Sequence, residues 1–352
     1  MRIEENKPLA PFTTFGIGGP ARWFVEAQDE DDVLGAAAWA QERAVPLFVL
    51  GGGSNLLVAD AGFDGMVLRV GLRGIDVNEA DADQVLLSAA AGENWECCVQ
   101  RSVESDCAGI ECLAGIPGTV GGTPVQNVGA YGQEVGSVIE QVRVIDLVDG
   151  ASVEFQANEC GFSYRRSRFN AEDRGRYIVT RVDYRLKRGG PPTLRYVDLQ
   201  RAFPGGIRPT LPDVADAVRR IRRNKGMLLV EGDPDCHSAG SFFKNPVVPE
   251  ERMREIAAAA GMEPPRFPAG VDGQVKVPAA WLIEQAGFAK GFEMGAAGIS
   301  SRHTLALINR GGATAGEMIA LATRIRDAVE AQFRICLEQE PVLLGFCATR
   351  EA

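Results

Sequence analysis

Only two histidines occur among the 352 residues, His237 and His303. That scarcity leaves little material for a histidine-based metal site or a Ser-His-Asp triad, and we expect no metal. No run of about 18 uninterrupted apolar residues occurs either, so we expect no membrane insertion. The N-terminal sequence MRIEENKPLA lacks the basic and then apolar pattern of a secretory signal, which favours a cytoplasmic protein.

An excess of positive charge is also absent, because the formal net charge is −10. This balance argues against a nucleic-acid partner, so an anionic ligand would have to be held by local basic groups. The eight cysteines are scattered and form no C-x-x-C pair. We therefore expect reduced thiols rather than a disulfide framework.

What is present is ordinary globular composition, with 45% apolar and 24% charged residues. A chain of this length suits two or three domains. The pattern of elements places the boundaries near residues 72 and 224, which divides the chain into 1–72, 73–223 and 224–352.

Apolar periodicity and helix-start signals predict mixed helices and strands. Helices are expected over residues 29–41, 95–106, 211–223, 249–260, 279–286 and 314–333. Strands are expected over residues 21–27, 45–50, 66–70, 85–90, 305–308 and 335–344, with antiparallel strands over 140–147, 151–157 and 177–187. The fold class is therefore α+β.

Two glycine-rich loops stand out, and both are expected to follow buried strands. Gly51-Gly52-Gly53-Ser54-Asn55 can turn successive backbone N–H groups inward, which makes a nest for phosphate oxygens. The second loop runs from Gly115 to Gly122 and precedes the segment QNVGAYG. Neither fits G-x-G-x-x-G or the G-K-[ST] of a Walker loop. A set of tight turns is the alternative for either loop alone, whereas the pair together favours a dinucleotide.

Gly240-Ser241-Phe242-Phe243-Lys244-Asn245-Pro246 places a hydroxyl, an ammonium and an amide within one short turn. In order along the chain, the sequence shows LGGGSN, GIPGTVGG, QNVGAYG, FSYRRSRF, AGSFFKNP and LEQEPVLLG. This set resembles the UDP-N-acetylenolpyruvoylglucosamine reductase family of peptidoglycan precursor synthesis, over nearly the whole chain. LRYVDL, at residues 194–199, resembles the tyrosine loop of the longer, type I members.

The resemblance implies an FAD-binding module of the vanillyl-alcohol-oxidase/PCMH-like type, made of two subdomains (1–72 and 73–223), followed by an α+β substrate-binding domain (224–352). It implies non-covalent FAD, NADPH as reductant and UDP-N-acetylglucosamine-enolpyruvate as substrate, and we expect a monomer. The implied cofactor-binding residues are Gly51, Gly52, Gly53, Ser54, Asn55, Gly115, Ile116, Pro117, Gly118, Thr119, Gly122, Asn127, Gly129, Ala130 and Tyr131.

In this family pattern, hydride from reduced FAD N5 adds to C3 of the enolpyruvyl ether, and Ser241 gives the proton to C2. Arg165 holds the substrate carboxylate, and Glu340 stabilises the enediolate charge. The sequence around Glu340 departs from the family, with Gln339 for proline and Pro341 for valine. Without the motif, Ser241 would be a turn-capping serine, Arg165 part of a solvated basic turn and Glu340 an exposed carboxylate.

Tyr164, Tyr196, Lys225 and Asn245 match substrate-contacting positions of the family. Lys225 could equally end a solvated helix, where the dipole favours a cation. The segment between Lys225 and Ser241 is longer than in compact members. His303 falls where the family has a polar residue near the substrate. A purely structural histidine is an equally good interpretation.

Two other functional classes compete with this interpretation. One is a different flavin oxidoreductase on the same module, although a covalent flavin would need a histidine near the glycine loops. The other is a non-catalytic nucleotide-binding protein. Flavin colour, followed by reoxidation with the enolpyruvyl substrate, discriminates among the three.

Overall fold

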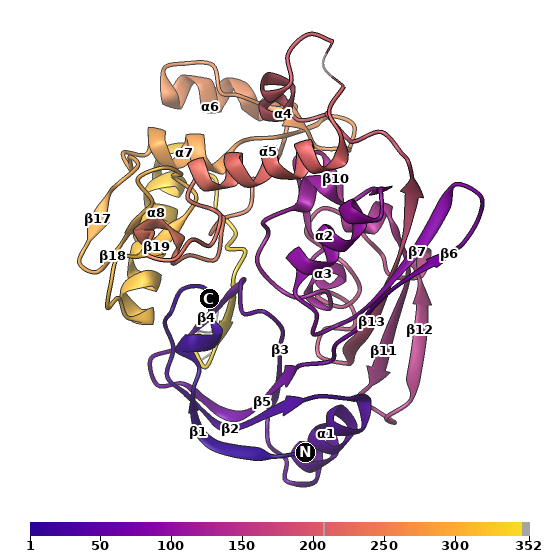
Figure 1. The fold of residues 1–352 in the computed structure, drawn as a ribbon. Coiled ribbons are helices and arrows are strands. Elements are labelled where there is room, and N and C mark those ends of the chain that lie inside the picture. Colours follow the sequence, from indigo (N-terminus) through magenta and orange to yellow (C-terminus); the bar gives the residue numbers. More distant parts are fainter. Residues whose placement is uncertain (207, 347–352) are drawn as a thin grey trace. The chain divides into compact units, whose positions relative to one another are not determined.

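The three segments predicted as antiparallel strands pair with one another in the computed structural model, which describes residues 1–206 and 208–346. Val142 lies opposite Phe155 on one side and Val182 on the other. The sheet order is β12-β11-β13-β7-β6, and β8 pairs with β13. Five of these strands run side by side in Figure 1: β6 (Ile75–Glu79), β7 (Gln84–Ala90), β11 (Ile139–Asp146), β12 (Ser152–Gln156) and β13 (Tyr177–Arg188). The short strand β8 comprises Cys107–Ala108.

A second sheet has the order β1-β2-β5-β3, and β3 runs parallel to β5. The predicted β-α-β start is confirmed: the helix α1 (Glu30–Glu42) begins where the Asp29 side chain accepts the Asp32 N–H at 2.8 Å. The strands are β1 (Ile3–Pro8), β2 (Pro20–Ala27), β3 (Leu47–Leu50) and β5 (Phe63–Val70).

The described chain forms two compact units. Unit 1 comprises Met1–Lys7, Ala21–Gly53 and Asp64–Arg223, and unit 2 comprises Pro8–Pro20, Ser54–Phe63 and the chain from Asn224 on. The division into 1–72, 73–223 and 224–352 stays a prediction.

In unit 1 the helix α2 packs on the large sheet, because the buried Trp95 ring lies 5.7 Å from the Tyr184 ring of β13. The apolar face of α5 joins the same core through Val214 and Val218. The remaining elements of this unit are α2 (Trp95–Glu104), α3 (Gly122–Val125), α4 (Val197–Ala202), α5 (Leu211–Asn224), β9 (Gly129–Ala130) and β10 (Gln133–Glu134), with 3-10 turns at Glu111–Leu113, Val135–Ser137 and Ala157–Glu159.

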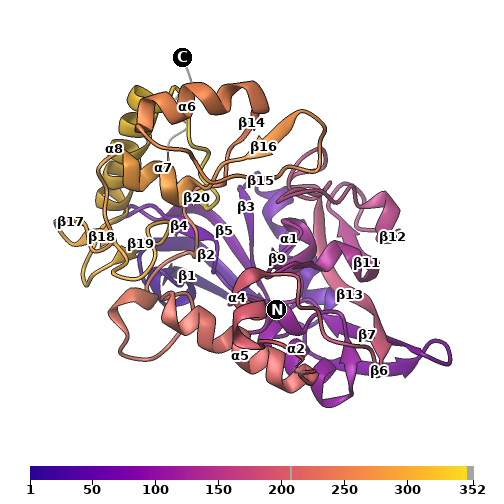
Figure 2. The ribbon, with the colours of Figure 1, turned by 90° about the horizontal axis from the view of Figure 1, so that it is seen from above.

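Unit 2 has its own core, built around the long helix α8 (Ala315–Phe333). Thr314 and Glu317 form the capping box that starts this helix, close to the predicted start. Figures 1 and 2 both show α7 and α8 beside β18 and β19. The other elements are β4 (Leu56–Val58), β14 (Val247–Pro249), β15 (Phe267–Pro268), β16 (Gln274–Lys276), β17 (Glu293–Met294), β18 (Ala297–Ile299), β19 (Leu307–Asn309), β20 (Val342–Leu344), α6 (Met253–Ala260) and α7 (Ala279–Gln285), with 3-10 turns at Ala10–Phe12, Pro234–Cys236 and Glu250–Arg252.

Three predicted elements are wrong in detail. The strand over 335–344 shrinks to β20, preceded by an isolated bridge at Gln339. Pro341 lies between Gln339 and β20 and has no N–H to donate, so the strand is interrupted there. The helix over 249–260 begins instead with a 3-10 turn, and the glycine loop at Gly115 follows the 3-10 turn Glu111–Leu113 rather than a buried strand.

No helix within residues 1–206 and 208–346 is both long enough and apolar enough to span a bilayer.

Candidate active site

The two glycine loops of unit 1 touch through bare backbone. A Cβ atom on Gly52 would lie 2.5 Å from the Gly118 Cα atom, and one on Gly51 would lie 2.8 Å from the Thr119 hydroxyl oxygen. Both distances are too short for any side chain, so glycine is required here by close approach. Gly118 also has a φ of 134°, which disfavours other residues.

The Thr119 hydroxyl oxygen is buried at this contact and has no hydrogen-bond partner among the described residues. Leaving a buried hydroxyl unsatisfied costs about 1–3 kcal/mol, so a ligand atom at the loop would stabilise it. Glycine backbone together with an available hydroxyl suits phosphate oxygens. These loops therefore fit the FAD that the sequence resemblance implies.

Ser54 and Asn55 continue the first loop but belong to unit 2. The Asn55 side-chain nitrogen donates to the Glu340 carbonyl oxygen at 3.2 Å, and the Val342 N–H donates to the Asn55 carbonyl oxygen at 3.0 Å. Asn55 therefore fastens the segment that carries Glu340 as well as extending the glycine nest.

The Gly115 peptide is held on both sides by charged groups. The Arg222 Nε atom of α5 donates to the Gly115 carbonyl oxygen at 2.9 Å, and a Glu96 carboxylate oxygen of α2 accepts the Gly115 N–H. Arg222 also hydrogen-bonds with the Tyr131 side chain, and its burial lowers its pKa. Arg222 thus joins the two loops that are predicted to bind the cofactor.

Arg222 was not predicted as a site residue, because the basic segment RRIRRNK at residues 219–225 is typical of a solvated helix end. Within the described residues, Arg222 is the one cationic side chain among the buried polar residues, with 7% exposure. It follows Val214 and Val218 at intervals of four, on the buried face of the helix. That spacing was the available signal.

The remaining predicted residues of this loop region are positioned mainly by backbone. Ile116 and Pro117 lie between the two glycines of GIPG, Gly122 opens α3, and Ala130 lies in β9. Room around Gly122 is open, so packing does not require a glycine there.

The loop containing Asn127 to Tyr131 is strained. Asn127 has a φ of 45° and Tyr131 a φ of 49°, and the second value is unusual for a bulky residue. The Asn127 side-chain nitrogen donates to the Ser163 carbonyl oxygen at 3.0 Å, and its oxygen accepts the Gly136 N–H at 2.9 Å. The Asn127 amide therefore connects this loop to the turn that carries Arg165.

Arg165 lies in a tight turn, closed by reciprocal backbone hydrogen bonds between Ser163 and Arg166 at 3.0 and 3.1 Å. Its own φ is 56°, which makes it a third strained position after Asn127 and Tyr131. The guanidinium donates to the Gly129 carbonyl oxygen at 3.1 Å and lies 5.6 Å from the Tyr164 ring centroid. The structure therefore brings Arg165 and Tyr164 to the glycine loop at Gly129.

Two tyrosines extend this group. The Tyr196 ring meets the Tyr131 ring edge-on, with centroids 5.3 Å apart. Tyr164 and Tyr196 remain 37% and 41% exposed, although both are large aromatic side chains. Exposed aromatic rings beside a strained loop are suited to ligand contact.

In unit 2, the segment containing Ser241 pairs antiparallel with the segment containing Glu340. Phe243 lies opposite Gln339 in an isolated bridge, and the Glu340 N–H donates to the Phe242 carbonyl oxygen at 2.9 Å. The buried rings of Phe242 and Phe243 anchor the segment. Ser241 therefore directly precedes the residue that pairs with Glu340, which brings the two predicted residues to one place.

Glu338, the carboxylate two residues before Glu340, has a different environment. Its side chain is 71% exposed and forms an ion pair with Lys244. The Asn245 side-chain oxygen accepts the Ala279 N–H at 2.9 Å, at the start of α7. Asn245 thus caps a helix with its oxygen.

Lys225 and His303 also lie in unit 2. Burial, together with the nearby Lys225 and Lys290 ammonium groups, lowers the pKa of His303 to about 4. Its Nδ1 atom accepts the Leu305 N–H at 3.1 Å, so this nitrogen carries no proton. The imidazole is therefore neutral at physiological pH.

Arg165, Tyr164 and Tyr196 belong to unit 1, whereas Ser241, Glu340, Lys225 and Asn245 belong to unit 2.

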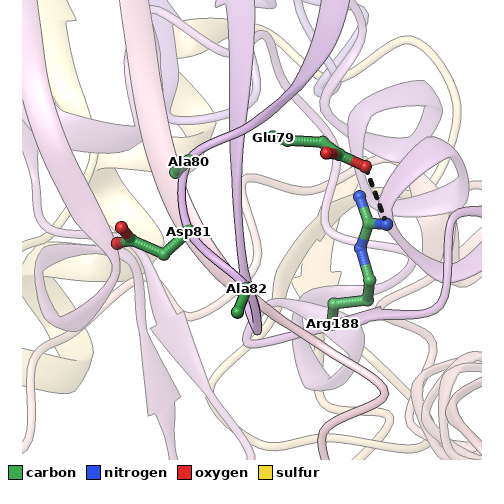
Figure 3. A pocket seen from close by; sticks show the side chains of 5 residues that line it. All are labelled: Glu79, Ala80, Asp81, Ala82 and Arg188. Atoms are coloured by element: carbon green, nitrogen blue, oxygen red, sulfur yellow. Dashed lines mark hydrogen bonds and ion pairs between the residues drawn. The ribbon is translucent and has the colours of Figure 1, made fainter.

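Among the described residues, no group of three or more His, Cys, Asp or Glu side chains could hold a metal ion. A surface pocket at the β6–β7 hairpin, shown in Figure 3, is lined by Glu79, Ala80, Asp81, Ala82 and Arg188. It includes none of the predicted site residues and is explained by the exposed Glu79–Arg188 ion pair at 3.1 Å.

Comparison with known proteins gives two family models that match the chain. "UDP-N-acetylenolpyruvoylglucosamine reductase, C-terminal domain" matches residues 233–344, and "FAD binding domain" matches residues 21–156. These matches and the observed elements confirm the predicted α+β fold, with an FAD-binding module of the vanillyl-alcohol-oxidase/PCMH-like type.

Similar whole proteins carry the same name. The chain is 45% identical to UDP-N-acetylenolpyruvoylglucosamine reductase of Streptomyces coelicolor, over 97% of this chain and 90% of the relative. It is 44% identical to the reductase of Thermobifida fusca, over 97% of each chain. A crystal structure of the enzyme from Thermus caldophilus matches with a TM-score of 0.67 and 28% identity, over 98% of this chain and 99% of that one.

Proposed function

The chain belongs to the UDP-N-acetylenolpyruvoylglucosamine reductase family, and we propose that it reduces the enolpyruvyl ether of UDP-N-acetylglucosamine-enolpyruvate to UDP-N-acetylmuramate with NADPH as reductant. It is an FAD-dependent oxidoreductase. The antiparallel pairing of the Ser241 and Glu340 segments carries this proposal, because it places residues from distant parts of the sequence on neighbouring backbone segments.

Bound FAD supplies the hydride that reaches C3 of the enolpyruvyl group. We propose that it is held non-covalently by residues 51–55, the loop 115–122 and the loop 127–131. The close approach of Gly52 to Gly118 and the buried Thr119 hydroxyl support this assignment. Arg222 and Glu96 hold the Gly115 peptide in place for binding.

The proposed acid is Ser241, which gives its proton to C2 after hydride addition. Hydride addition places negative charge on C2 and the carboxylate before that proton arrives, and this charge has to be stabilised in a dry site. Arg165 can hold the carboxylate in a bidentate fork, and Glu340 can hydrogen-bond the enediolate oxygen. The strained backbone of Arg165 supports a functional role, since such strain gathers at active sites.

On the substrate side, we propose that Tyr164, Tyr196, Lys225 and Asn245 contact the nucleotide sugar. The Tyr131–Tyr196 contact supports the type I form, because it fixes the loop at residues 194–199 against the cofactor loop. The division into FAD-binding subdomains 1–72 and 73–223 and substrate-binding domain 224–352 is part of the proposal, as are a monomeric state and a cytoplasmic location.

Anaerobic stopped-flow absorbance tests the proposed function on the purified protein. We expect bound flavin to be reduced by NADPH and then reoxidised by UDP-N-acetylglucosamine-enolpyruvate, with a product heavier by two hydrogens. Reduced flavin that reacts only with dioxygen would instead identify another flavin oxidoreductase. Protein that neither carries nor binds FAD would contradict the assignment of the glycine loops.

A further inference from the structure

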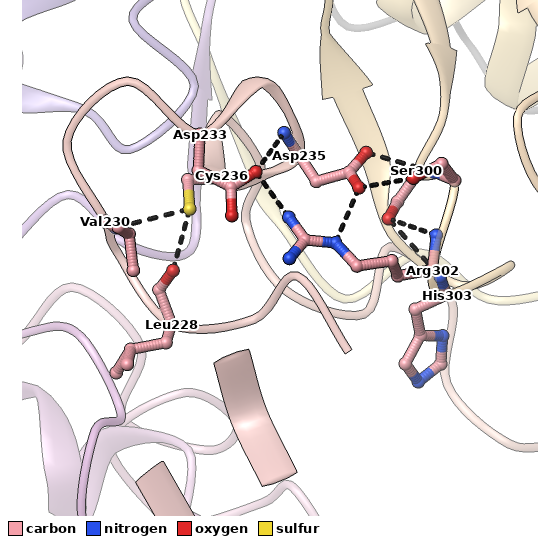
Figure 4. A network of polar contacts seen from close by, with 9 residues as sticks. Leu228, Val230, Asp233, Asp235, Cys236, Ser300, Arg302 and His303 are labelled. Atoms are coloured by element: carbon pink, nitrogen blue, oxygen red, sulfur yellow. Dashed lines mark hydrogen bonds and ion pairs between the residues drawn. The ribbon is translucent and has the colours of Figure 1, made fainter. Parts of the chain in front are cut away.

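A charge network centred on the buried Asp235 connects the segment between Lys225 and Ser241 to the turn at residues 300–303 (Figure 4). Asp235 is 5% exposed and accepts two hydrogen bonds from Ser301, at 3.0 Å from the backbone N–H and 2.7 Å from the hydroxyl. The Arg302 Nε atom donates to Asp235 at 2.7 Å, and Arg302 also pairs with Asp233. One guanidinium is therefore held between two carboxylates, Asp233 at the N-cap of the 3-10 turn Pro234–Cys236 and Asp235 within that turn.

This arrangement is a connected network of hydrogen bonds and ion pairs rather than an isolated surface ion pair. Arg302 lowers the pKa of the Asp233 carboxyl, and the hydrogen bonds from Ser301 and Arg302 outweigh the effect of burial on Asp235 and lower its pKa. Both carboxylates are therefore ionised near neutral pH. Cys236 adds a further tie, because its thiol donates to the Leu228 carbonyl oxygen at 2.7 Å and accepts the Val230 N–H at 3.2 Å.

The network packs directly on the residue that follows Lys225. A Cβ atom on Gly226 would lie 3.0 Å from the Asp235 Cβ atom, 3.2 Å from the Arg302 Nε atom and 3.2 Å from the Ser300 hydroxyl oxygen. Gly226 also has a φ of 66°, which favours glycine. The backbone at Lys225 and Gly226 is thus fixed by its contact with the Asp235–Arg302 pair.

We propose that Asp235 and Arg302 are positioning residues that hold the Lys225–Gly226 backbone so that the Lys225 ammonium binds the anionic part of the substrate. This inference rests on the proposed function, because that function assigns Lys225 to substrate contact. It gives the long segment between Lys225 and Ser241 a role. A flexible lysine would lose side-chain and backbone freedom on binding, whereas a backbone fixed beforehand reduces that cost.

The same turn carries His303, whose backbone N–H donates to the Ser300 hydroxyl oxygen at 3.3 Å. In Figure 4 the His303 ring points away from the network. The Ser300 hydroxyl accepts the Arg302 N–H as well, at 3.1 Å. One network therefore fixes two backbone segments, one with Lys225 and one with His303.

A double-mutant cycle on the FAD-loaded enzyme tests the inference. Binding of UDP-N-acetylglucosamine-enolpyruvate to oxidised enzyme is measured from the change in flavin absorbance, for the parent, Asp235→Asn, Lys225→Ala and the double variant. We expect Asp235→Asn alone to weaken binding about 10- to 100-fold, the size of a lost charge-assisted hydrogen bond. In the Lys225→Ala background, the same change should weaken binding by less than about twofold, because the two effects are coupled.

Arg302→Lys keeps the charge but loses the planar fork, so we expect weaker binding with the same coupling to Lys225. The rate of flavin reoxidation at saturating substrate should change far less than the dissociation constant. Glu293→Gln is the matched control, since it removes an exposed ion pair with Arg310 in the same unit and should leave binding unchanged. Thermal midpoints and FAD content show which variants have folded.

Each outcome has a separate meaning. If Lys225→Ala weakens binding but neither Asp235→Asn nor Arg302→Lys does, the positioning role is wrong and the proposed function stands. Equal weakening by Asp235→Asn in both backgrounds would also overturn the inference, because Asp235 would then act through another group. If Lys225→Ala leaves binding unchanged, the assignment of Lys225 fails first, and the inference fails with it.

Discussion

The role proposed for Ser241 is unusual, because a serine hydroxyl is a weak acid in water. The backbone pairing of Phe242 with Glu340 positions the Ser241 segment, and two buried phenylalanines follow Ser241 in the sequence. In a site with little water, a nearby cation acts more strongly on the substrate carbanion. It also acts more strongly on the serine oxygen that loses its proton. A serine placed this way can protonate a strongly basic carbon.

We therefore expect Ser241→Ala to separate the two half-reactions. NADPH-driven flavin reduction should remain nearly intact, since it needs no acid at C2. Reoxidation by the enolpyruvyl substrate should slow by about 10²- to 10⁴-fold, the usual contribution of a general acid. Single-turnover stopped-flow absorbance measures both steps.

Ser241→Cys should recover part of the lost rate, because a thiol is the stronger acid. Glu338→Gln is a suitable control on the paired segment, since that side chain is exposed and pairs with Lys244. If the flavin of the alanine variant is reoxidised at the parent rate, Ser241 is a turn residue and not the acid. An equal loss in both half-reactions would point to misplaced flavin and leave Glu340 as the next candidate acid.

His303 gives a prediction for stability against pH. Its pKa is lowered from 6.5 to about 4 in the folded protein, chiefly by burial and then by Lys225 and Lys290. Between these two values the unfolded chain binds more protons, so the free energy of unfolding falls as the pH drops from 6.5 towards 4. His303→Gln should flatten this part of the stability curve, as measured by urea unfolding at several pH values.

Lys290→Met is a useful partner variant, because removal of one ammonium group should raise the pKa of His303 in the folded protein. The pH range over which the free energy of unfolding falls should then become narrower. NMR titration of the imidazole protons measures that pKa directly, and only two histidines have to be assigned. The lowered pKa values of Asp233 and Asp235 act in a separate range, with stability lost below about their usual value of 3.8. An imidazole that titrates near 6.5 in the folded enzyme would contradict the prediction.

At the scale of elements, we propose that the two glycine loops bind the cofactor together, and their close contact makes the prediction sharp. Gly52→Val would place branched carbon atoms against the Gly118 backbone, so the loops would have to separate. We expect flavin-free protein, or FAD affinity weaker by at least about 100-fold, which corresponds to about 2.7 kcal/mol or more. FAD fluorescence quenching during titration measures the affinity.

Gly35→Ala is the matched glycine control in the same unit. A Cβ atom there would lie 3.6 Å from the Met1 sulfur atom, an ordinary contact, and alanine favours the helix α1. It should retain FAD at the parent affinity. Gly52→Val protein with unchanged FAD affinity would show that the contact with Gly118 is not part of the cofactor site.

Arg222→Met tests whether the helix α5 supports FAD binding through its contact with the glycine loop at Gly115. Methionine fills a similar volume but cannot donate to the Gly115 carbonyl oxygen, which is then buried without this partner. We expect FAD affinity to fall by about 10-fold or more, with the melting temperature of the FAD-free protein changing little by comparison. A large loss of FAD-free stability with unchanged FAD affinity would make Arg222 a purely structural residue.

Elements with strong local signals were predictable from sequence. The helix α8 has a capping box and a long apolar face, and the strands β11 to β13 alternate in polarity. The strand predicted over 335–344 failed because its pairing depends on Phe243, almost a hundred residues away, and on the missing N–H of Pro341. Local patterns do not contain that information.

The same reasoning applies to the site. Ser241 and Glu340 came from motif resemblance, and the structure explains their proximity by strand pairing. Arg222 and Asp235 were not predicted because charged residues are usually exposed, and only tertiary packing shows which are buried. Arg302 was not predicted because its partners, Asp233 and Asp235, lie far away in the sequence. Gly226 gave no signal in the sequence, since its need for glycine comes from the side chains of distant residues.

For the whole molecule, the order of substrate binding is the remaining question. The chain contains no G-x-G-x-x-G fingerprint, so no separate Rossmann site for NADPH is expected. We therefore expect NADPH and the enolpyruvyl substrate to use one site in turn, with NADP⁺ leaving before the substrate enters.

A shared site predicts parallel lines in double-reciprocal plots of initial rate at several fixed substrate concentrations, the pattern of a ping-pong mechanism. Excess enolpyruvyl substrate should also inhibit, because it would occupy the site of the oxidised enzyme before NADPH does. Lys225→Ala provides a direct check: if the site is shared, the variant should weaken binding of both ligands, whereas separate sites would leave NADPH affinity unchanged. Lines that intersect at low substrate concentrations, together with an absence of substrate inhibition, would require both ligands to be bound at once and would rule out the single shared site.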